Sequence, residues 1–302
     1  MARVSDNSSQ MLGDDDIRMD AAVAATVASI SRMTTWTLVD EMPLRFDVHH
    51  PQGMARVGST WWISTVDVST RRGLIMAADC HGNLLEEAPI GDSWRYHPGG
   101  MDFDGSAFWV ACAEYVPDST TTVFRMQPGE APHRAFDVDD HVGAIARCGV
   151  DGDIVGWSWG SRRFYRWSVD GQLLDARTNP GFFVDHQDCQ WLEGGHLLCG
   201  GVAEVSLATG PGWLGGLGLL DVDTLEMARE VPFPIYTSTG RVGTHNPLWA
   251  EVRDENLILH VLPDDGISTL QSYATPMVGI RSTTPVVLEE GFEPVGASTS
   301  SS

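Results

Sequence analysis

The sequence contains no lysine: its 19 basic side chains are all arginines, against 41 acidic side chains. Enzymes that form a Schiff base, pyridoxal-phosphate enzymes and proteins with a Walker-type phosphate loop each need a lysine amine, so these classes are excluded. The net charge of −22 argues against a nucleic acid or an anionic membrane surface as partner. We expect a small-molecule substrate instead.

Cysteines are few, and they lack informative spacing. There are five of them, an odd number without any Cys-x-x-Cys pair, so neither a zinc knuckle nor a disulfide framework is indicated. Free thiols in a reducing cytoplasm are the better interpretation. The acidic run Asp14, Asp15 and Asp16 precedes the first apolar stretch, unlike the basic start of a secretory signal. No stretch approaches the roughly 18 apolar residues of a membrane helix, so we predict a cytoplasmic protein.

Helical periodicity is almost absent after residue 35. Short alternating runs, such as residues 60–66 and 107–112, are bounded by turn pairs such as Asp104-Gly105 and Asp170-Gly171, a pattern typical of an all-β chain. The sequence predicts three parts: a flexible N-terminal segment with one short alanine-rich helix over residues 1–33, a β-propeller over 34–290, and a disordered tail over 291–302.

A repeat centred on histidine favours the propeller over a sandwich or a barrel. Segments 50–54 (HPQGM) and 97–101 (HPGGM) are near copies, and three further segments align with them. The five histidines are His50, His97, His141, His186 and His245. Consecutive members lie 47, 44, 45 and 59 residues apart. A period in the forties is the length of a four-stranded blade. The long fourth unit is explained by a glycine-rich insertion at 206–218.

The repeat also holds at a point that does not involve the histidines. A second apolar strand opens 10 to 12 residues after each of them, at Thr60, Ala107, Asp153, His196 and Asn256. Five such units predict a five-bladed β-propeller. The extra strand at 36–39 would pair with the last unit, which closes the ring and removes a sheet edge. Residues 275–302 are too few for a sixth blade.

The first strand of each blade lines the central channel of a propeller, so the five histidines should form a ring at its mouth. Neutral imidazole is the commonest protein ligand for zinc, iron and other transition metals. Three or four imidazoles on one ion, with an open position, form a catalytic arrangement. We therefore predict a divalent metal ion (iron, manganese, zinc or nickel) held by His50, His97, His141, His186 and His245. The structural alternative is that each histidine donates a hydrogen bond to the backbone of the adjacent blade.

The loops after the second strands should reach the same mouth. Glu114 and Glu204 lie there as candidate general acids or bases, although acids at such positions are often only solvated. The planar guanidinium of Arg162 would suit a substrate carboxylate. Trp213, in the insertion, is expected to cover the pocket as a lid.

Two stretches, HPGGMD from residue 97 and GWSWGSR from residue 156, resemble an uncharacterised bacterial propeller family, a domain of unknown function. The resemblance covers about residues 35–275; it implies a propeller fold and no activity. A histidine ring at a propeller mouth is also similar to the sites of iron-dependent carotenoid-cleavage oxygenases and manganese-dependent oligogalacturonate lyases, which have seven blades. Five-bladed glycosidases place carboxylates where this chain has histidines.

The leading hypothesis is a metal-dependent enzyme acting on a small or medium organic substrate. Lyase or isomerase chemistry driven by proton abstraction is favoured over hydrolysis or oxygenation. One alternative is a metal-free enzyme in which the histidines act as acid and base. Another is a propeller without enzymatic activity that binds a ligand or a peptide.

Overall fold

The computed structural model describes residues 14–149, 152–181, 183–192 and 194–278. Within these residues the chain is all-β, with twenty strands, one α-helix and one short 3₁₀ turn. Gly105 and Gly171 have φ angles of +90° and +83°, which a glycine adopts without steric cost. They form two of the turns that the sequence predicts between consecutive strands.

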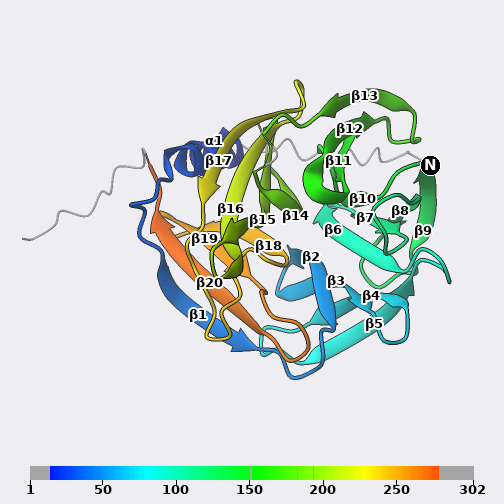
Figure 1. Cartoon of the computed structure of the whole chain (residues 1–302), viewed down its shortest axis with the longest axis horizontal. Helices are drawn as coiled ribbons and strands as arrows, with labels where there is room; N and C mark the ends of the chain where they lie inside the picture. The colour runs from blue at the N-terminus through cyan, green and yellow to red at the C-terminus, as the bar shows by residue number, and fades with distance from the viewer. Residues whose placement is uncertain (1–13, 150–151, 182, 193, 279–302) are drawn as a thin grey trace, which may run out of the picture.

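The strands form four sheets (Figure 1). The first has the order β2-β3-β4-β5, with bounds His50–Val57, Thr60–Asp67, Arg72–Ala78 and Leu84–Ile90. The second has the order β14-β15-β16-β17, with bounds Asp185–Leu192, His196–Leu207, Gly210–Asp221 and Glu226–Pro232. The third has the order β1-β20-β19-β18, with bounds Thr37–Pro43, Thr269–Pro276, Asn256–Val261 and Leu248–Arg253.

The fourth sheet is eight-stranded and consists of two antiparallel runs. The run β6-β7-β8-β9 has the bounds His97–Phe103, Phe108–Ala113, Thr121–Met126 and His133–Val138. The run β10-β11-β12-β13 has the bounds Val142–Arg147, Ile154–Ser158, Arg163–Trp167 and Leu173–Thr178. The two runs are joined through one parallel pair, Gly100 on β6 with Ala144 on β10. In Figure 1 the sheets surround a centre where β2, β6, β14 and β18 meet, a propeller-like arrangement.

The predicted strand register is confirmed. Strands β3, β15 and β19 begin at the residues that the repeat marks, Thr60, His196 and Asn256, while β7 and β11 begin one residue later. The predicted pairing of the N-terminal strand with the last unit is confirmed too. Strand β1 pairs antiparallel with β20, from Thr37 opposite Ala274 to Pro43 opposite Thr269.

Helix α1 (Asp14–Ser29) lies against the sheets. Val23, Val27 and Ile30 are buried in one apolar cluster with Trp36 and Phe233, beside strands β16 and β17 (Figure 1). The sequence predicts one short helix in this segment, and its side chains three and four residues apart share one face that covers apolar sheet surface. Residues 1–13 of the segment and the tail predicted at 291–302 lie outside the described residues. Among the described residues no helix combines the length and apolarity needed to cross a membrane.

A single carboxylate on β14 links the innermost strands. Asp188 Oδ1 accepts a hydrogen bond from the Met101 N–H at 3.0 Å. Its Oδ2 accepts one from Met54 at 3.0 Å and one from Leu248 at 3.2 Å. These donors lie on β6, β2 and β18, so the Asp188 side chain links its own strand, β14, to three other strands. Burial raises the pKa of Asp188 well above its usual value, and a side chain at Gly100 would collide with Oδ1, since a Cβ there would lie 2.7 Å from it.

Candidate functional site

A cavity of about 140 Å³ lies where the inner strands begin. Its walls come from β2, β6, β14 and the start of β10, from the loop after β7, from the end of β11, and from the 3₁₀ turn η1 (Trp159–Ser161) between β11 and β12. The lining includes His50, His97, Tyr115, His141, Trp159 and Asp185. The repeat therefore does bring most of its histidines to one place.

His141 is held in one tautomer. Its Nδ1 lies 2.9 Å from the carbonyl oxygen of Val116 and 3.2 Å from the Ser119 hydroxyl. Because a carbonyl oxygen only accepts, Nδ1 carries the proton when the ring is neutral. Nε2 then keeps its lone pair, and it makes no hydrogen bond within the described residues. Burial lowers the pKa of His141, which favours this neutral form.

His97 lies beside His141, with 5.4 Å between the ring centroids. It is 6% exposed, and neither of its ring nitrogens has a hydrogen-bond partner among the described residues. Burial, with repulsion from His141 and His50, holds the pKa of His97 well below its usual value. Leaving a buried polar nitrogen without a partner costs about 1–3 kcal/mol, so these two nitrogens need an explanation.

His50 is fully engaged. Its Nδ1 donates to Asp265 Oδ1 at 2.8 Å, and its Nε2 lies 2.9 Å from the amide nitrogen of Gln52, which donates to it. Arg241 donates to the other oxygen of Asp265 at 2.6 Å. Burial alone would raise the pKa of Asp265, but the hydrogen bonds from His50 and Arg241 outweigh burial and hold it well below the usual range. Asp265 is a functional candidate that sequence reasoning missed, since it lies 215 residues from His50.

The other two predicted ring members point elsewhere. His186 contributes to the wall, but its side chain is fully buried and Nε2 lies 3.4 Å from Glu230 Oε1 on β17. A Cβ on Gly218 would come within 2.7 Å of this imidazole, so the ring is inserted against the sheet. His245 lies outside the wall, edge-on to Trp213 with 5.8 Å between centroids. In the described part of the chain, no three side chains of His, Cys, Asp or Glu are placed to hold a metal ion.

Two larger aromatic rings complete the cavity. Tyr115 packs against His97 with 4.2 Å between centroids, and Trp159 meets His141 edge-on at 4.6 Å. The tyrosine and tryptophan rings are themselves 6.2 Å apart. The turn that carries Trp159 continues into Ser161, a buried residue with φ of +50°. The Ser161 hydroxyl oxygen accepts the His186 N–H at 2.7 Å, which fixes η1 to β14.

Asp185 supplies a carboxyl group to the same wall. Its Oδ1 lies 3.3 Å from the Ser161 hydroxyl, which donates to it. Burial raises the pKa of Asp185. Asp185 and Asp140 each precede a ring histidine, but Asp140 instead accepts a hydrogen bond from the Tyr165 hydroxyl at 2.5 Å.

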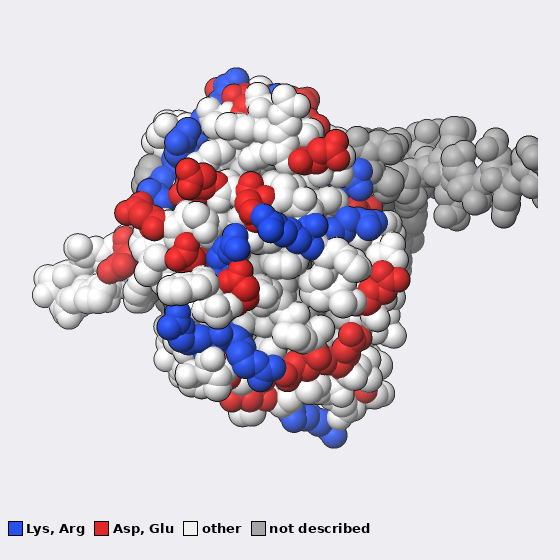
Figure 2. Space-filling view, turned by 90° about the vertical axis from the view of Figure 1, so that its right-hand side faces the viewer, with Lys and Arg blue, Asp and Glu red and all other residues white. Residues whose placement is uncertain are grey.

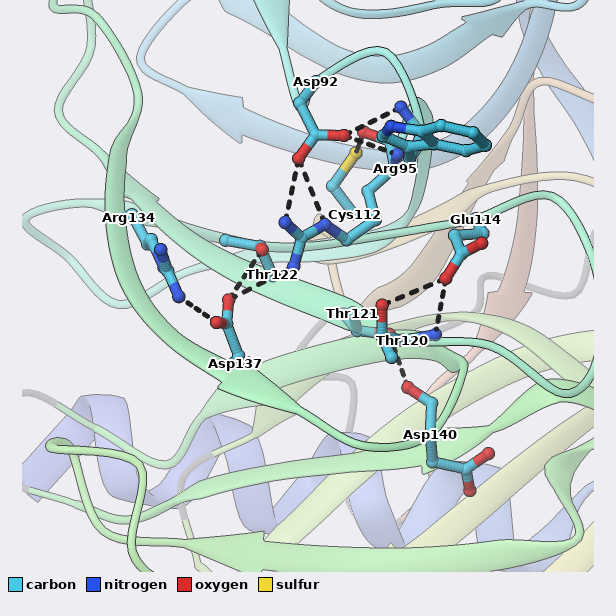
Figure 3. A network of polar contacts seen from close by, with 11 residues as sticks. Asp92, Arg95, Cys112, Glu114, Thr120, Thr121, Thr122, Arg134, Asp137 and Asp140 are labelled. Carbon is cyan, nitrogen blue, oxygen red and sulfur yellow. Dashed lines mark hydrogen bonds and ion pairs between the residues drawn. The ribbon is translucent and has the colours of Figure 1, made fainter.

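None of the predicted catalytic side chains lies in the wall. Glu114 accepts hydrogen bonds from the Thr120 N–H and hydroxyl at 3.2 and 3.0 Å (Figure 3). It faces a separate acidic depression beside Asp118. Arg162 donates its Nε–H to the Trp159 carbonyl oxygen at 2.7 Å, and its side chain is 40% exposed. Short local bonds to their own loops therefore hold Glu114 and Arg162 away from the cavity.

The insertion at 206–218 lengthens a hairpin and covers nothing in the cavity. Strands β15 and β16 each have twelve residues, and their paired ends carry Glu204 opposite Trp213. Glu204 is exposed, and Trp213 is 41% exposed and outside the wall. The expectation of a lid is thus wrong for Trp213, because twelve-residue strands continue the ladder beyond the mouth.

Outside the cavity the charges are interspersed. Figure 2 shows arginines in short rows between acidic side chains on the face that carries β9. There Arg95 donates to Asp92 at 2.9 Å and lies 3.5 Å from Asp137, which Arg134 also contacts (Figure 3). All five cysteines are free thiols, as the spacing predicts.

Comparison with known proteins gives a family. Residues 19–277 match a family of unknown function (DUF6454). The chain belongs to the DUF6454 family. This agrees with the resemblance carried by the two motifs, and like that resemblance it brings no activity. No curated protein matches the sequence.

Solved structures similar to this DUF6454 chain share the fold alone. A bifunctional GH43-CE protein of Bacteroides eggerthii is 12% identical, with a TM-score of 0.52 over 78% of this chain and 34% of that one. A streptogramin B lyase structure is 10% identical, with a TM-score of 0.47 over 82% of this chain and all of the other. A protein of unknown function from Bacteroides caccae is 10% identical, with a TM-score of 0.44 over 70% and 71% of the two chains.

Proposed function

We propose that the protein is an enzyme that moves a proton on a small organic substrate bound in this cavity, with His141 as the general base and no metal ion. The observation that carries the proposal is the pair formed by His97 and His141. One ring has both nitrogens unpartnered and buried, and the other has a fixed tautomer with a free Nε2. A bound substrate would supply the missing partners.

The two imidazoles would have different roles. His141 Nε2 would take a proton from a carbon next to a carbonyl group, forming an imidazolium whose Nδ1–H stays bonded to Val116. The N–H of neutral His97 would donate to the carbonyl oxygen as it gains negative charge. Return of the proton to another carbon gives an isomerisation, and loss of a neighbouring leaving group gives a lyase reaction. The lowered pKa values of both rings support this assignment, because a base must be unprotonated at neutral pH.

The test is hydrogen exchange in D₂O. Small carbonyl compounds are incubated with the protein, and loss of the C–H signal next to the carbonyl is followed by proton NMR. For a compound that the wild type exchanges, His141→Gln should slow exchange by about 10²–10⁴-fold, the usual contribution of a positioned base. His97→Gln should slow it as well, with substrate binding retained.

His133→Gln is the matched control, because His133 is exposed on β9 and outside the cavity. It should exchange at the wild-type rate, and so should the wild type in the presence of a chelator. Exchange that persists in His141→Gln would contradict the proposal.

A second candidate keeps the metal ion. His97 and His141 are adjacent, with 5.4 Å between their ring centroids, and could give a divalent ion two imidazoles. No third His, Cys, Asp or Glu side chain of the described residues is placed to complete the set, so the third ligand would have to move toward them. His50, His186 and His245 would have to leave Asp265, Glu230 and Trp213 before they joined. Calorimetric titration with Zn²⁺ or Mn²⁺ decides: binding of one equivalent that is lost in His97→Gln and retained in His133→Gln supports the metal enzyme over the first candidate.

The cavity would sit at the mouth of a five-bladed ring. Its support is the grouping of strands into five antiparallel units of four, each led by one inner strand, with β1 as the outer strand of the last unit. The inner strands are β2, β6, β10, β14 and β18. Counting the eight-stranded sheet as two blades gives this ring.

A further inference from the structure

The aromatic side chains in the cavity wall resemble those of an aromatic cage that binds cations. Four aromatic rings face one small volume: Tyr115, Trp159, His97 and His141, with centroid separations between 4.2 and 6.2 Å. Tyr115 and Trp159 are only half-buried, so part of each ring remains accessible in the wall of the cavity. The π faces of aromatic rings attract cations, and quaternary ammonium groups are recognised in such cages.

The charges around the rings point the same way. Among the residues that the structure describes, the lining contains Asp185 as its one acidic side chain and has no arginine. Arg162 lies outside the wall: it donates to the Trp159 carbonyl oxygen and lies 3.9 Å from Asp140. An anionic ligand would therefore meet a carboxyl group and no arginine in the wall, whereas a cation would be paired with that carboxyl group.

We propose that the cavity binds a small organic cation, a quaternary or methylated ammonium group, held by the faces of Tyr115 and Trp159 and paired with Asp185. The inference rests on the proposed function, because it names the class of substrate for the same cavity. The ammonium group lies at the rings and leaves the nitrogens of His97 and His141 for the reacting carbonyl and C–H groups. A quaternary ammonium has no N–H to satisfy, which suits walls made mainly of ring surface.

Asp185 and Trp159 are positioned together because both are connected to Ser161. Asp185 and Trp159 are tied together through Ser161, whose hydroxyl contacts Asp185 and whose backbone continues the turn that carries the indole. The carboxylate and the ring are thus one rigid unit across β14 and η1. A fixed position of the Trp159 ring matters because a cation–π contact acts only within about 6 Å of the ring centroid.

The experiment compares a cation with its neutral isostere. Choline and 3,3-dimethylbutan-1-ol have the same shape and differ by the charge on one atom. Binding of each is measured by calorimetry and by quenching of tryptophan fluorescence. Choline should bind the wild type at least about tenfold more tightly, a difference of about 1.4 kcal/mol. Asp185→Asn should remove most of that preference, and Trp159→Leu should weaken binding of choline further.

Asp118→Asn is the matched control, because it removes an exposed carboxylate near the cavity but outside its wall. It should leave the preference for choline unchanged. Equal binding of the two compounds by the wild type, or no binding of either, overturns the cation proposal. Neither result touches the exchange test with His141→Gln, so failure of the cation proposal and failure of the proposed base are distinguishable. Melting curves of Asp185→Asn identify any loss of folding, in which case the wild-type comparison alone decides.

Discussion

A single carboxylate on β14 links the backbones of three other strands. Asp188 satisfies the backbone N–H groups of Met54, Met101 and Leu248 with two oxygens. Each of these donors is buried, so removing the acceptor leaves groups that cannot find water. Asp188 lies two residues after His186, and its three donors come from distant segments that no local sequence pattern contains.

Asp188→Asn should therefore destabilise the protein strongly. The amide presents one oxygen and an NH₂ group, so at least one of the three N–H donors loses its acceptor and faces another donor. We expect a loss of about 2–4 kcal/mol in the free energy of unfolding, measured by urea denaturation. Asp223→Asn, on an exposed turn, should change it by less than about 0.5 kcal/mol. A wild-type midpoint for Asp188→Asn would show that the carboxylate is not needed as a shared acceptor.

At the level of strands, irregular pairing explains why side-chain directions could not be read from the sequence. The register shifts just after the histidine position in β2, β6, β10 and β14, between Pro51 and Gly53 in the first of them and between His186 and Asp188 in the last. A bulge changes which face the following residues point to. Repeat spacing places His50 and His97 at the first residue of their strands and His141 and His186 within one residue of a strand start. It does not encode the bulges or the contacts that decide where each side chain points.

The same limit applies to the partners of the site. Thr60 and His196 could be placed at strand starts because alternation and turns are local signals. The contacts of His50 with Asp265 and of His186 with Glu230 join distant segments, and no local pattern contains them.

Closure of the last sheet by β1 can be tested with a cross-link. Glu41 and Gln271 are paired residues on β1 and β20, and Gln271 donates to Glu41 at 3.0 Å. The double variant Glu41→Cys, Gln271→Cys should form a disulfide on oxidation. Because it would close a loop of more than 200 residues, it should raise the free energy of unfolding by about 3–5 kcal/mol, an effect that a reductant removes.

The single variant Glu41→Cys should show no such gain, which controls for the five natural thiols. Thiol titration of the unfolded protein shows whether the bond has formed. Failure of the pair to oxidise would mean that β1 does not occupy this edge in solution.

For the molecule as a whole, buried acids set how stability depends on pH. Burial raises the pKa of Asp102 to about 7, against hydrogen bonds from the N–H groups of Trp191 and Phe103. In the unfolded chain the group ionises near pH 4. Between these values the folded state holds a proton that the unfolded state has lost, so stability falls as pH rises from about 4 to 7.

Asp102→Asn should remove this part of the pH dependence. The slope for one such group is at most about 1.4 kcal/mol per pH unit, and urea denaturation at pH 5 and pH 7 measures it. Asp139→Asn, an exposed acid, should keep the wild-type slope. An unchanged slope in Asp102→Asn would show that the group is ionised in the folded protein.

The pairing of β1 with β20 also determines when during synthesis the molecule can finish folding. Strand β1 ends at residue 43 and its partner begins at residue 269. The ribosome therefore adds more than 200 residues before β1 can form its backbone hydrogen bonds with β20. Contacts of such separation make folding slow and leave partly made chains with open sheet edges. Leu248, a donor to Asp188, is likewise made late. A nascent chain that stops short lacks both closures, so it remains a substrate for chaperones and proteases until the final strand is released.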